Sequence, residues 1–235
     1  MSSTIANPEQ PQIEKYFNTI TKKYDLLNTI LSLGLDRLWR RTAVRALMQR
    51  QPTDVLDIGA GTGRMVEELL NQSPSVAITG IDVAEEMLKL ASHRIQSGSV
   101  AWRVASGLNL PFEDQVFNGA MTAFTLRSIQ KLDVFFQEVY RVLQPGSRFV
   151  ILELTRPPSQ FMRFFHQLYV RFFVPLVGRL LSQDKEAYAF LSHSVLKFEE
   201  PANIADKMHK AGFKDVQVNA LSGGIVHLII GDRRD

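Results

Sequence analysis

The sequence contains no cysteine, which excludes disulfide bonds and thiolate metal sites. Its first residues, MSSTIANPEQPQ, lack the apolar core of a secretory signal peptide. Long apolar runs are missing too: within residues 161–181 the longest uncharged stretch is the seven residues 172–178, too short to span a bilayer. No histidines or acids are spaced like metal ligands, so we expect no metal. These absences favour a cytoplasmic protein.

Charge is distributed unevenly along the 235 residues, although the net charge is only +3. Residues 1–50 carry 8 basic side chains against 4 acidic ones, and residues 51–155 carry 8 against 12. Residues 156–181 contain four arginines and no acid. Basic flanks of this kind bind nucleic acid or an anionic membrane, or are simply solvated helix faces. Because they contain no recognisable RNA-binding module, we expect no nucleic-acid partner.

Short apolar runs alternate with helical periodicity from residue 52 onward, which indicates a parallel sheet covered by helices. The expected strands are 53–59, 75–82, 100–105, 116–124 and 148–154, and the expected helices are 64–72, 84–95 and 132–143. Pro145 and Gly146 are expected to stop the last of these helices. Residues 215–221 and 225–231, joined by Ser-Gly-Gly, predict a β-hairpin that closes the sheet. The fold class is therefore α/β with a mostly parallel, seven-stranded sheet.

Two segments lie outside this alternating core. Residues 9–50 predict two helices with aromatic and basic residues, and residues 159–211 predict a long, mostly helical insertion. With 45% hydrophobic residues, the chain is expected to form a single domain. We divide it into an N-terminal helical cap (1–50), a ligand-binding core (51–155), a helical insertion (156–212) and a closing hairpin (213–235).

A glycine-rich turn, DVLDIGAGTG at residues 54–63, follows the first expected strand. It is not a phosphate-binding P-loop, because Arg64 and Met65 stand where lysine and serine or threonine are required. It is not the dinucleotide fingerprint either, because Arg64 replaces the third glycine. Asp57 at the mouth of the turn would repel a pyrophosphate. The pattern favours a ligand with positive charge.

S-adenosylmethionine has that charge, with a sulfonium, an ammonium and no phosphate. Asp57 and the turn could receive its methionine end, because Gly59, Gly61 and Gly63 let the main chain approach closely. Asp82 ends the second strand, nineteen residues after Gly63, where a carboxylate can accept hydrogen bonds from both ribose hydroxyls. The alternative is an ordinary strand-to-helix turn, with Asp82 capping the following helix.

Longer motifs resemble a known family. VLDIGAGTG, GIDVAEEML, LPFEDQVFN and YRVLQPGSRFVILE resemble the class I S-adenosylmethionine-dependent methyltransferases, which have a Rossmann-like fold. YDLLNTILSLGLDRLWRR, AFTLRSI, LELTRP and PLVGRLLSQDKEAYAFLSHSV are similar to the ubiquinone/menaquinone biosynthesis C-methyltransferases, which methylate the ring of a prenylated quinol. The resemblance runs from about residue 14 to 230. It implies S-adenosylmethionine as co-substrate and a prenylated quinol as acceptor.

The resemblance extends the set of cofactor-binding residues. Ser106 and Gly107 occupy the positions beside the adenine, where the family usually has Asn-Ala or Asp-Ala. On the acceptor side, Thr125 and Ser128 replace the glycine and asparagine of the family's motif. The full expected cofactor-binding set is Asp57, Gly59, Gly61, Thr62, Gly63, Asp82, Val83, Ser106 and Gly107.

Methylation of an aromatic carbon requires an electron-rich ring held in line with the sulfonium. A free phenol has a pKa of about 10, so a fixed cation nearby would favour the nucleophilic phenolate. Arg127 is our candidate for that cation, because it follows the fourth strand and matches the family's arginine. The alternative is a surface arginine paired with an acid. Tyr188 and His193 are candidates to accept or relay the proton.

Residues 159–181, with aromatic residues and interspersed arginines, allow two interpretations: a lid over the sheet, or a helix at a lipid interface, which would make the protein peripheral on the cytoplasmic membrane face. A homodimer is also possible. Besides a quinol C-methyltransferase, the sequence allows a methyltransferase for another lipophilic or polyketide-like aromatic acceptor. It also allows a non-catalytic binding or assembly subunit, although the intact glycine turn and Asp82 argue against this.

Overall fold

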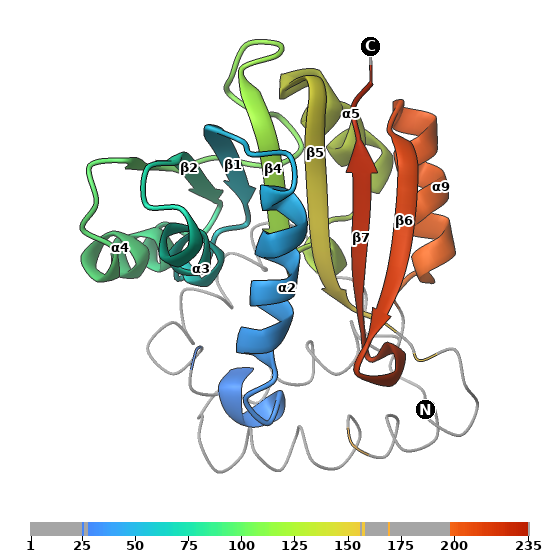
Figure 1. Cartoon of the computed structure of the whole chain (residues 1–235), viewed down its shortest axis with the longest axis horizontal. Coiled ribbons are helices and arrows are strands. Elements are labelled where there is room, and N and C mark those ends of the chain that lie inside the picture. The colour runs from blue at the N-terminus through green and yellow to red at the C-terminus, as the bar shows by residue number, and fades with distance from the viewer. Residues whose placement is uncertain (1–24, 26–27, 156, 158–168, 170–197, 235) are drawn as a thin grey trace, which may run out of the picture.

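One seven-stranded sheet organises the part of the chain that the computed structural model describes, which is residues 25, 28–155, 157, 169 and 198–234 (Figure 1). The strand order is β3-β2-β1-β4-β5-β7-β6, and only β7 runs antiparallel to its neighbours. The strands are β1 (Asp54–Ile58), β2 (Ala77–Asp82), β3 (Val100–Val104), β4 (Phe117–Ala123), β5 (Leu143–Leu154), β6 (Lys214–Leu221) and β7 (Val226–Asp232). The predicted α/β fold, including the closing hairpin, is confirmed.

Helices cover both faces of this sheet. They are α2 (Asp36–Met48), α3 (Arg64–Gln72), α4 (Glu85–Arg94), α5 (Leu132–Val142) and α9 (Pro201–Ala211), with the short 3-10 helices η1 (Leu126–Ser128) and η3 (Ser222–Gly224). Helix α2 packs on β4, β5 and α3 on one face, whereas α5 and α9 pack together on the other, and α4 lies along β2 and β3 (Figure 1). This arrangement follows from amphipathicity, because each helix buries one apolar stripe.

Two apolar clusters hold these layers together. On the α2 face, Trp39, Val44 and Leu47 pack with Val55 and Val150 from the sheet. On the opposite face, the rings of Phe135, Phe136, Phe149 and Phe213 form a fully buried group. Strand β7 is buried along its whole length between β5 and β6. The sheet therefore gives a rigid platform for the loops at its carboxyl end.

Strand β5 begins earlier than the sequence predicted. We expected a helix to residue 143 and a strand from 148, but α5 ends at Val142 and β5 begins at Leu143. Gly146, with φ of 82°, donates its N–H to the carbonyl of Arg233 at 2.8 Å. This bond to the segment after β7 keeps the chain extended through the Pro-Gly pair, so the strand is not interrupted there. The pairing of β5 with β4 shifts its register between Phe117 and Gly119 of β4.

Parts of both segments flanking the core lie outside the described residues. Of the helices expected in residues 9–50, the structure describes a helical turn from residue 28 and helix α2. Of the expected insertion, it describes α9 and residue 169 but not 158–168 or 170–197. Among the described residues, no helix is long and apolar enough to cross a membrane. The four-part division of the chain therefore stays a prediction.

Candidate active site

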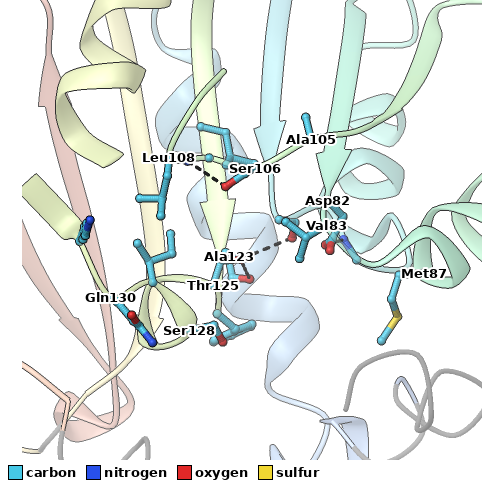
Figure 2. Close-up of a pocket in the computed structure, with 17 residues that line it drawn as sticks. Asp82, Val83, Met87, Ala105, Ser106, Leu108, Ala123, Thr125, Ser128 and Gln130 are labelled. Atoms are coloured by element: carbon cyan, nitrogen blue, oxygen red, sulfur yellow. Dashed lines mark hydrogen bonds between the residues drawn. The ribbon is translucent and has the colours of Figure 1, made fainter. Parts of the chain in front are cut away.

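A pocket of about 310 Å³ opens at the carboxyl end of the parallel strands (Figure 2). Its walls come from the ends of β1, β2 and β4 and from the loops that follow β3 and β4. Carboxyl ends of parallel strands are where ligands of open α/β sheets bind. Six of the nine expected cofactor-binding residues line it: Gly59, Gly61, Asp82, Val83, Ser106 and Gly107.

The three glycines of the turn serve different purposes. All have positive φ: 69° at Gly59, 55° at Gly61 and 82° at Gly63. A Cβ at Gly59 would lie 2.4 Å from the side chain of Thr125, and one at Gly63 would lie 2.9 Å from Ile95. A Cβ at Gly61 would meet no atom within 4 Å. Gly59 and Gly63 are therefore required by packing inside the protein, whereas Gly61 leaves the open space of the pocket clear for a ligand.

Asp57 carries a buried carboxylate that accepts no hydrogen bond from the residues that the structure describes. It is 1% exposed, and no described residue donates a hydrogen bond to either of its oxygens. Burial raises the pKa of Asp57 to about 7, with Arg40 opposing the shift and the negative charge of Asp82 adding to it. Asp57 does not itself line the pocket but precedes the glycines that do. A carboxylate in this state would gain most from a cationic group.

Asp82 lies at the end of β2 and lines the pocket beside Val83 (Figure 2). Its Oδ2 accepts the N–H of Gly61 at 2.8 Å, and its Oδ1 accepts the N–H of Ala84 at 2.9 Å. Burial raises the pKa of Asp82, although the backbone N–H donors oppose the shift. The two bonds fix the carboxylate across the glycine turn. The N-cap residue of α4 is Ala84, and no side-chain hydrogen bond caps this helix, so Asp82 is not its cap. An ionised carboxylate has further lone pairs, so the bond from Ala84 and hydrogen bonding to a ligand are compatible.

Ser106 and Gly107 lie in the loop after β3 and line the pocket, and Ser106 is labelled in Figure 2. The Oγ of Ser106 accepts the N–H of Leu108 at 3.2 Å and so shapes the loop. At Gly107 a Cβ would lie 2.9 Å from the ring of Phe135. A side chain at position 107 would therefore clash with the buried phenylalanine rings, which explains the glycine there.

Thr62 and Gly63, two other expected cofactor-binding residues, do not line the pocket. Thr62 is 3% exposed and its Oγ1 donates to Asp25 at 2.6 Å. Asp25 also pairs with Arg64 at 3.2 Å and with Arg94. The side chain of Thr62 thus joins the glycine turn to the N-terminal segment. Sequence reasoning missed this network, because its members are distant along the chain and no motif connects them.

The loop after β4 supplies the other side of the pocket. Thr125 and Ser128, two of the positions that differ from the family's motif, both line it, as do Phe124 and Gln130 (Figure 2). Phe124 has a φ of 60°, a conformation that costs a side chain of this size free energy and that is concentrated at functional sites. Sequence reasoning passed over Phe124 and also Met87, which lines the pocket one turn into α4.

Arg127 forms a buried ion pair just behind this loop. Its Nε donates to Oε1 of Glu153 at 2.7 Å, with the two side chains 7% and 0% exposed. The backbone N–H of Arg127 and that of Leu154 donate to the same carboxylate, at 3.4 and 2.9 Å. The alternative of a surface arginine therefore does not apply, although an acid partner exists. Glu153 was missed in the sequence, because no local pattern links this residue of β5 to Arg127 in η1, 26 positions earlier.

A second polar pair lies on the same face of β5 and β7. Thr155 Oγ1 and His227 Nδ1 are 2.6 Å apart, and burial lowers the pKa of His227. His227 is the register partner of Glu153. Tyr188 and His193, the predicted proton acceptors, lie outside the described residues. No group of three or more possible metal ligands occurs among the residues that are described.

Comparison with known proteins places this site in a family. Residues 5–233 match the ubiE/COQ5 methyltransferase family. The chain is 36% identical to the demethylmenaquinone methyltransferase of Porphyromonas gingivalis over 229 residues, covering 95% of this chain and 94% of that one. It is 35% identical to the ubiquinone/menaquinone biosynthesis C-methyltransferase UbiE of Desulfotalea psychrophila, covering 92% and 88%.

Solved structures support the same fold. A SAM-dependent methyltransferase from Thermotoga maritima, described as a possible histamine N-methyltransferase, superposes with a TM-score of 0.68 at 20% identity, covering 94% of this chain and 99% of that one. Human N-acetylserotonin methyltransferase in complex with SAM gives 0.61 at 18% identity, covering 92% and 59%. These likenesses show the Rossmann-like methyltransferase fold, and the match over nearly the whole sequence decides the family. The chain belongs to the ubiE/COQ5 methyltransferase family.

Proposed function

We propose that this methyltransferase transfers a methyl group from S-adenosylmethionine to a ring carbon of a prenylated quinol. The proposal rests mainly on the residues that line the two sides of the pocket. Asp82 and the glycine turn form one side, and Thr125, Ser128 and Gln130 form the other (Figure 2). Arg127 does not itself line the pocket but lies in η1, between the lining residues Thr125 and Ser128. The curated relatives are demethylmenaquinone and ubiquinone/menaquinone C-methyltransferases, which supports a quinol as the acceptor.

The residues present fit S-adenosylmethionine. Asp57 is a buried carboxylate to which no described residue donates a hydrogen bond, and a ligand ammonium would satisfy it. Gly61 leaves space that any Cβ would reduce. Asp82 is fixed by two backbone donors and keeps lone pairs for the ribose hydroxyls. Ser106 and Gly107 would form the wall beside the adenine.

When bound, S-adenosylmethionine supplies an electrophilic methyl group, so the protein's task is to make the acceptor ring nucleophilic and to hold it in line. Arg127 would stabilise the phenolate form of the ring electrostatically, because arginine stays protonated at every relevant pH. Glu153 fixes the guanidinium through Nε. The carboxylate also reduces the net charge of the pair, so the electrostatic effect of Arg127 on the acceptor would be confined to short range.

Tyr188 and His193 remain our proposed proton acceptors. The quinol hydroxyl loses a proton before attack. After methyl transfer the ring hydrogen leaves as a proton and the ring oxygen is protonated again, so that one proton is released overall. A base is therefore required on the acceptor side. Tyr188→Phe and His193→Ala, compared in the pH dependence of kcat/KM, would identify which side chain titrates. If one variant no longer shows the ionisation that the parent shows in its pH profile of kcat/KM, the residue replaced in that variant is the base.

Membrane contact and a cytoplasmic location are the finer parts of this proposal. An acceptor with a prenyl tail resides in the bilayer, and residues 159–181 carry arginines without acids. Replacing Arg163 and Arg171 by glutamine should reduce binding to anionic vesicles, since each basic residue near the surface contributes about 1 kcal/mol. Equal sedimentation of parent and double variant would leave this segment as a lid.

The deciding experiment is chemical. Purified protein is incubated with S-adenosylmethionine and either a demethylmenaquinol or a demethoxyubiquinol-type acceptor, and the quinone fraction is examined by mass spectrometry for a ring methyl group. In parallel, quinones are extracted from cells that lack the protein, where the unmethylated precursor should accumulate. A normal quinone profile in those cells, with methyl transfer to a different aromatic acceptor, would overturn the quinol assignment.

A further inference from the structure

An exposed apolar turn lies at the start of α2. Leu33 is 76% exposed, Leu38 58% and Leu35 39%, so three of the large hydrophobic side chains most exposed among the described residues fall within six positions. Arg37 and Arg41 are exposed on the same helix. We call these five residues the leucine–arginine surface. Scattered single exposed leucines are ordinary, but a cluster of them indicates a contact surface.

The turn is ordered, although Leu33 adopts an unfavourable conformation. Leu33 has a φ of 53° and Gly34 a φ of 78°. Backbone hydrogen bonds from Gly34 N to Thr29 O at 2.8 Å and from Leu35 N to Ser32 O at 3.0 Å close the turn. Left-handed backbone costs a leucine about 1 kcal/mol or more, and glycine or asparagine would fit better. Neither packing nor backbone geometry therefore explains the leucine at this position.

Charge on this surface has one sign. Arg37, Arg41 and Arg45 recur at every fourth residue and are exposed on one stripe of α2. The one acid in residues 28–50 is Asp36, which is 7% exposed and is held by Ser32 Oγ at 3.1 Å and Arg40 at 3.9 Å. The exposed stripe thus presents arginines and leucines together, an arrangement that suits an anionic lipid interface.

The surface lies at the functional end of the molecule. The first turn of α2 is at the same end of the sheet as the carboxyl ends of β4 and β5 (Figure 1). Trp39 packs edge-on against Phe124 of the pocket wall, with ring centroids 6.4 Å apart. Tyr169, from the basic aromatic segment 159–181, donates its hydroxyl to the carbonyl of Leu31 beside the turn. The start of α2 therefore contacts the pocket wall through Trp39, and the residues just before it contact Tyr169.

We infer that the leucine–arginine surface docks this protein on an anionic bilayer, with Leu33 and Leu38 inserting between headgroups and Arg37 and Arg41 pairing with lipid phosphates. The inference rests on the proposed function, because a bilayer-resident acceptor explains why the surface lies beside the pocket. A protein partner is less well matched. A stable protein interface buries about 800 Å² per partner, far more than three leucine side chains on a turn provide.

The experiment measures sedimentation with vesicles of phosphatidylcholine, with and without phosphatidylglycerol. Leu33→Asn/Leu38→Gln should lower binding about ten-fold or more per leucine, and so about 100-fold for the pair, if both side chains are fully buried in the bilayer. Asparagine suits the left-handed position, so the thermal stability of this variant should not fall. Arg37→Gln/Arg41→Gln should lower binding about five-fold per arginine, only on the anionic vesicles, and the loss should shrink as salt is added.

Lys210→Gln/Lys214→Gln is the matched control, because both lysines are exposed at the opposite end of the sheet. It should bind vesicles like the parent. Equal binding by the parent and the leucine variant, or an equal loss in the lysine control, overturns the inference. Concentration-dependent self-association that only the leucine variant loses, without vesicle binding by the parent, would instead assign the surface to a second copy of the chain. S-adenosylmethionine affinity should be the same in all variants, so an absence of methyl transfer to quinols would refute the proposed function without affecting the vesicle result.

Discussion

Asp57→Asn is expected to make the protein more stable when no ligand is bound. Burial raises the pKa of Asp57 from its usual value of 3.8 to about 7. One pKa unit corresponds to about 1.4 kcal/mol, so keeping this carboxylate ionised costs the folded state about 4 kcal/mol. Asparagine has nearly the same shape and carries no charge. The variant should therefore unfold at a higher urea concentration than the parent at pH 8.

The pH dependence tests the cause. A carboxyl group whose pKa is raised by folding contributes full stability below its unfolded pKa, and this contribution is lost as pH rises through the folded pKa. The advantage of Asp57→Asn should therefore be absent below about pH 4, grow between pH 4 and 7, and stay constant above pH 7. Urea unfolding across this range measures it, with Asp54→Asn, an exposed aspartate on the same strand, as the control.

Ligand binding should show the opposite trend. S-adenosylmethionine binding to the parent should strengthen as pH rises through 7, because the ammonium pairs with the ionised carboxylate, and Asp57→Asn should bind weakly at every pH. A stabilising substitution that weakens binding is the expected trade-off at a functional site. A variant that is less stable than the parent at pH 8, or whose advantage does not change with pH, would refute the reasoning about the buried carboxylate.

Three further substitutions test other parts of the site. Asp82→Ala should weaken S-adenosylmethionine binding by about 1–3 kcal/mol, because ribose hydroxyls lose their acceptor; unchanged affinity in calorimetric titration would reject the ribose assignment. Arg127→Ala should lower kcat about 100-fold or more while cofactor affinity is kept, and near-normal turnover with the acceptor would return Arg127 to a structural role. Gly59→Ala should lower stability by about 1–3 kcal/mol, because its Cβ would lie 2.4 Å from the Thr125 side chain. Adding Thr125→Ala should recover part of the melting temperature, and no recovery would show that backbone strain alone is responsible.

The sheet and its glycine turn could be predicted because their signals are local. Alternating apolar runs set the strands, and the glycines of residues 59–63 mark a turn after the first of them. The start of β5 could not, because the partner of Gly146 is the carbonyl of Arg233, at the far end of the sequence. From local propensity alone, the Pro-Gly pair predicts an interruption between helix and strand. A hydrogen bond to a residue distant in sequence instead holds these residues within β5.

The site was predictable only in part for the same reason. The sequence indicated that Asp57 suits a cation, but its burial depends on elements that pack around β1. The pairing of Arg127 with Glu153 joins η1, in the loop after β4, to strand β5, and the bond from Thr62 to Asp25 joins the turn to the N-terminal segment. The partners of each pair are far apart along the chain, and no motif spacing connects them. Such contacts depend on which elements the fold brings together. A single sequence predicts that only where a recognisable motif marks the elements.

The position of β7 between β5 and β6 has a consequence for how the chain is made. Strand β5 leaves one edge unpaired until Val226–Asp232 has been synthesised, which happens only after the whole insertion has been translated. An apolar, unpaired strand edge is a template for association with other chains, and sequence-distant pairings form slowly. Nascent chains should therefore be vulnerable to aggregation during this interval. Chaperone binding is expected to concentrate on Phe149–Leu152, the most apolar part of that waiting edge.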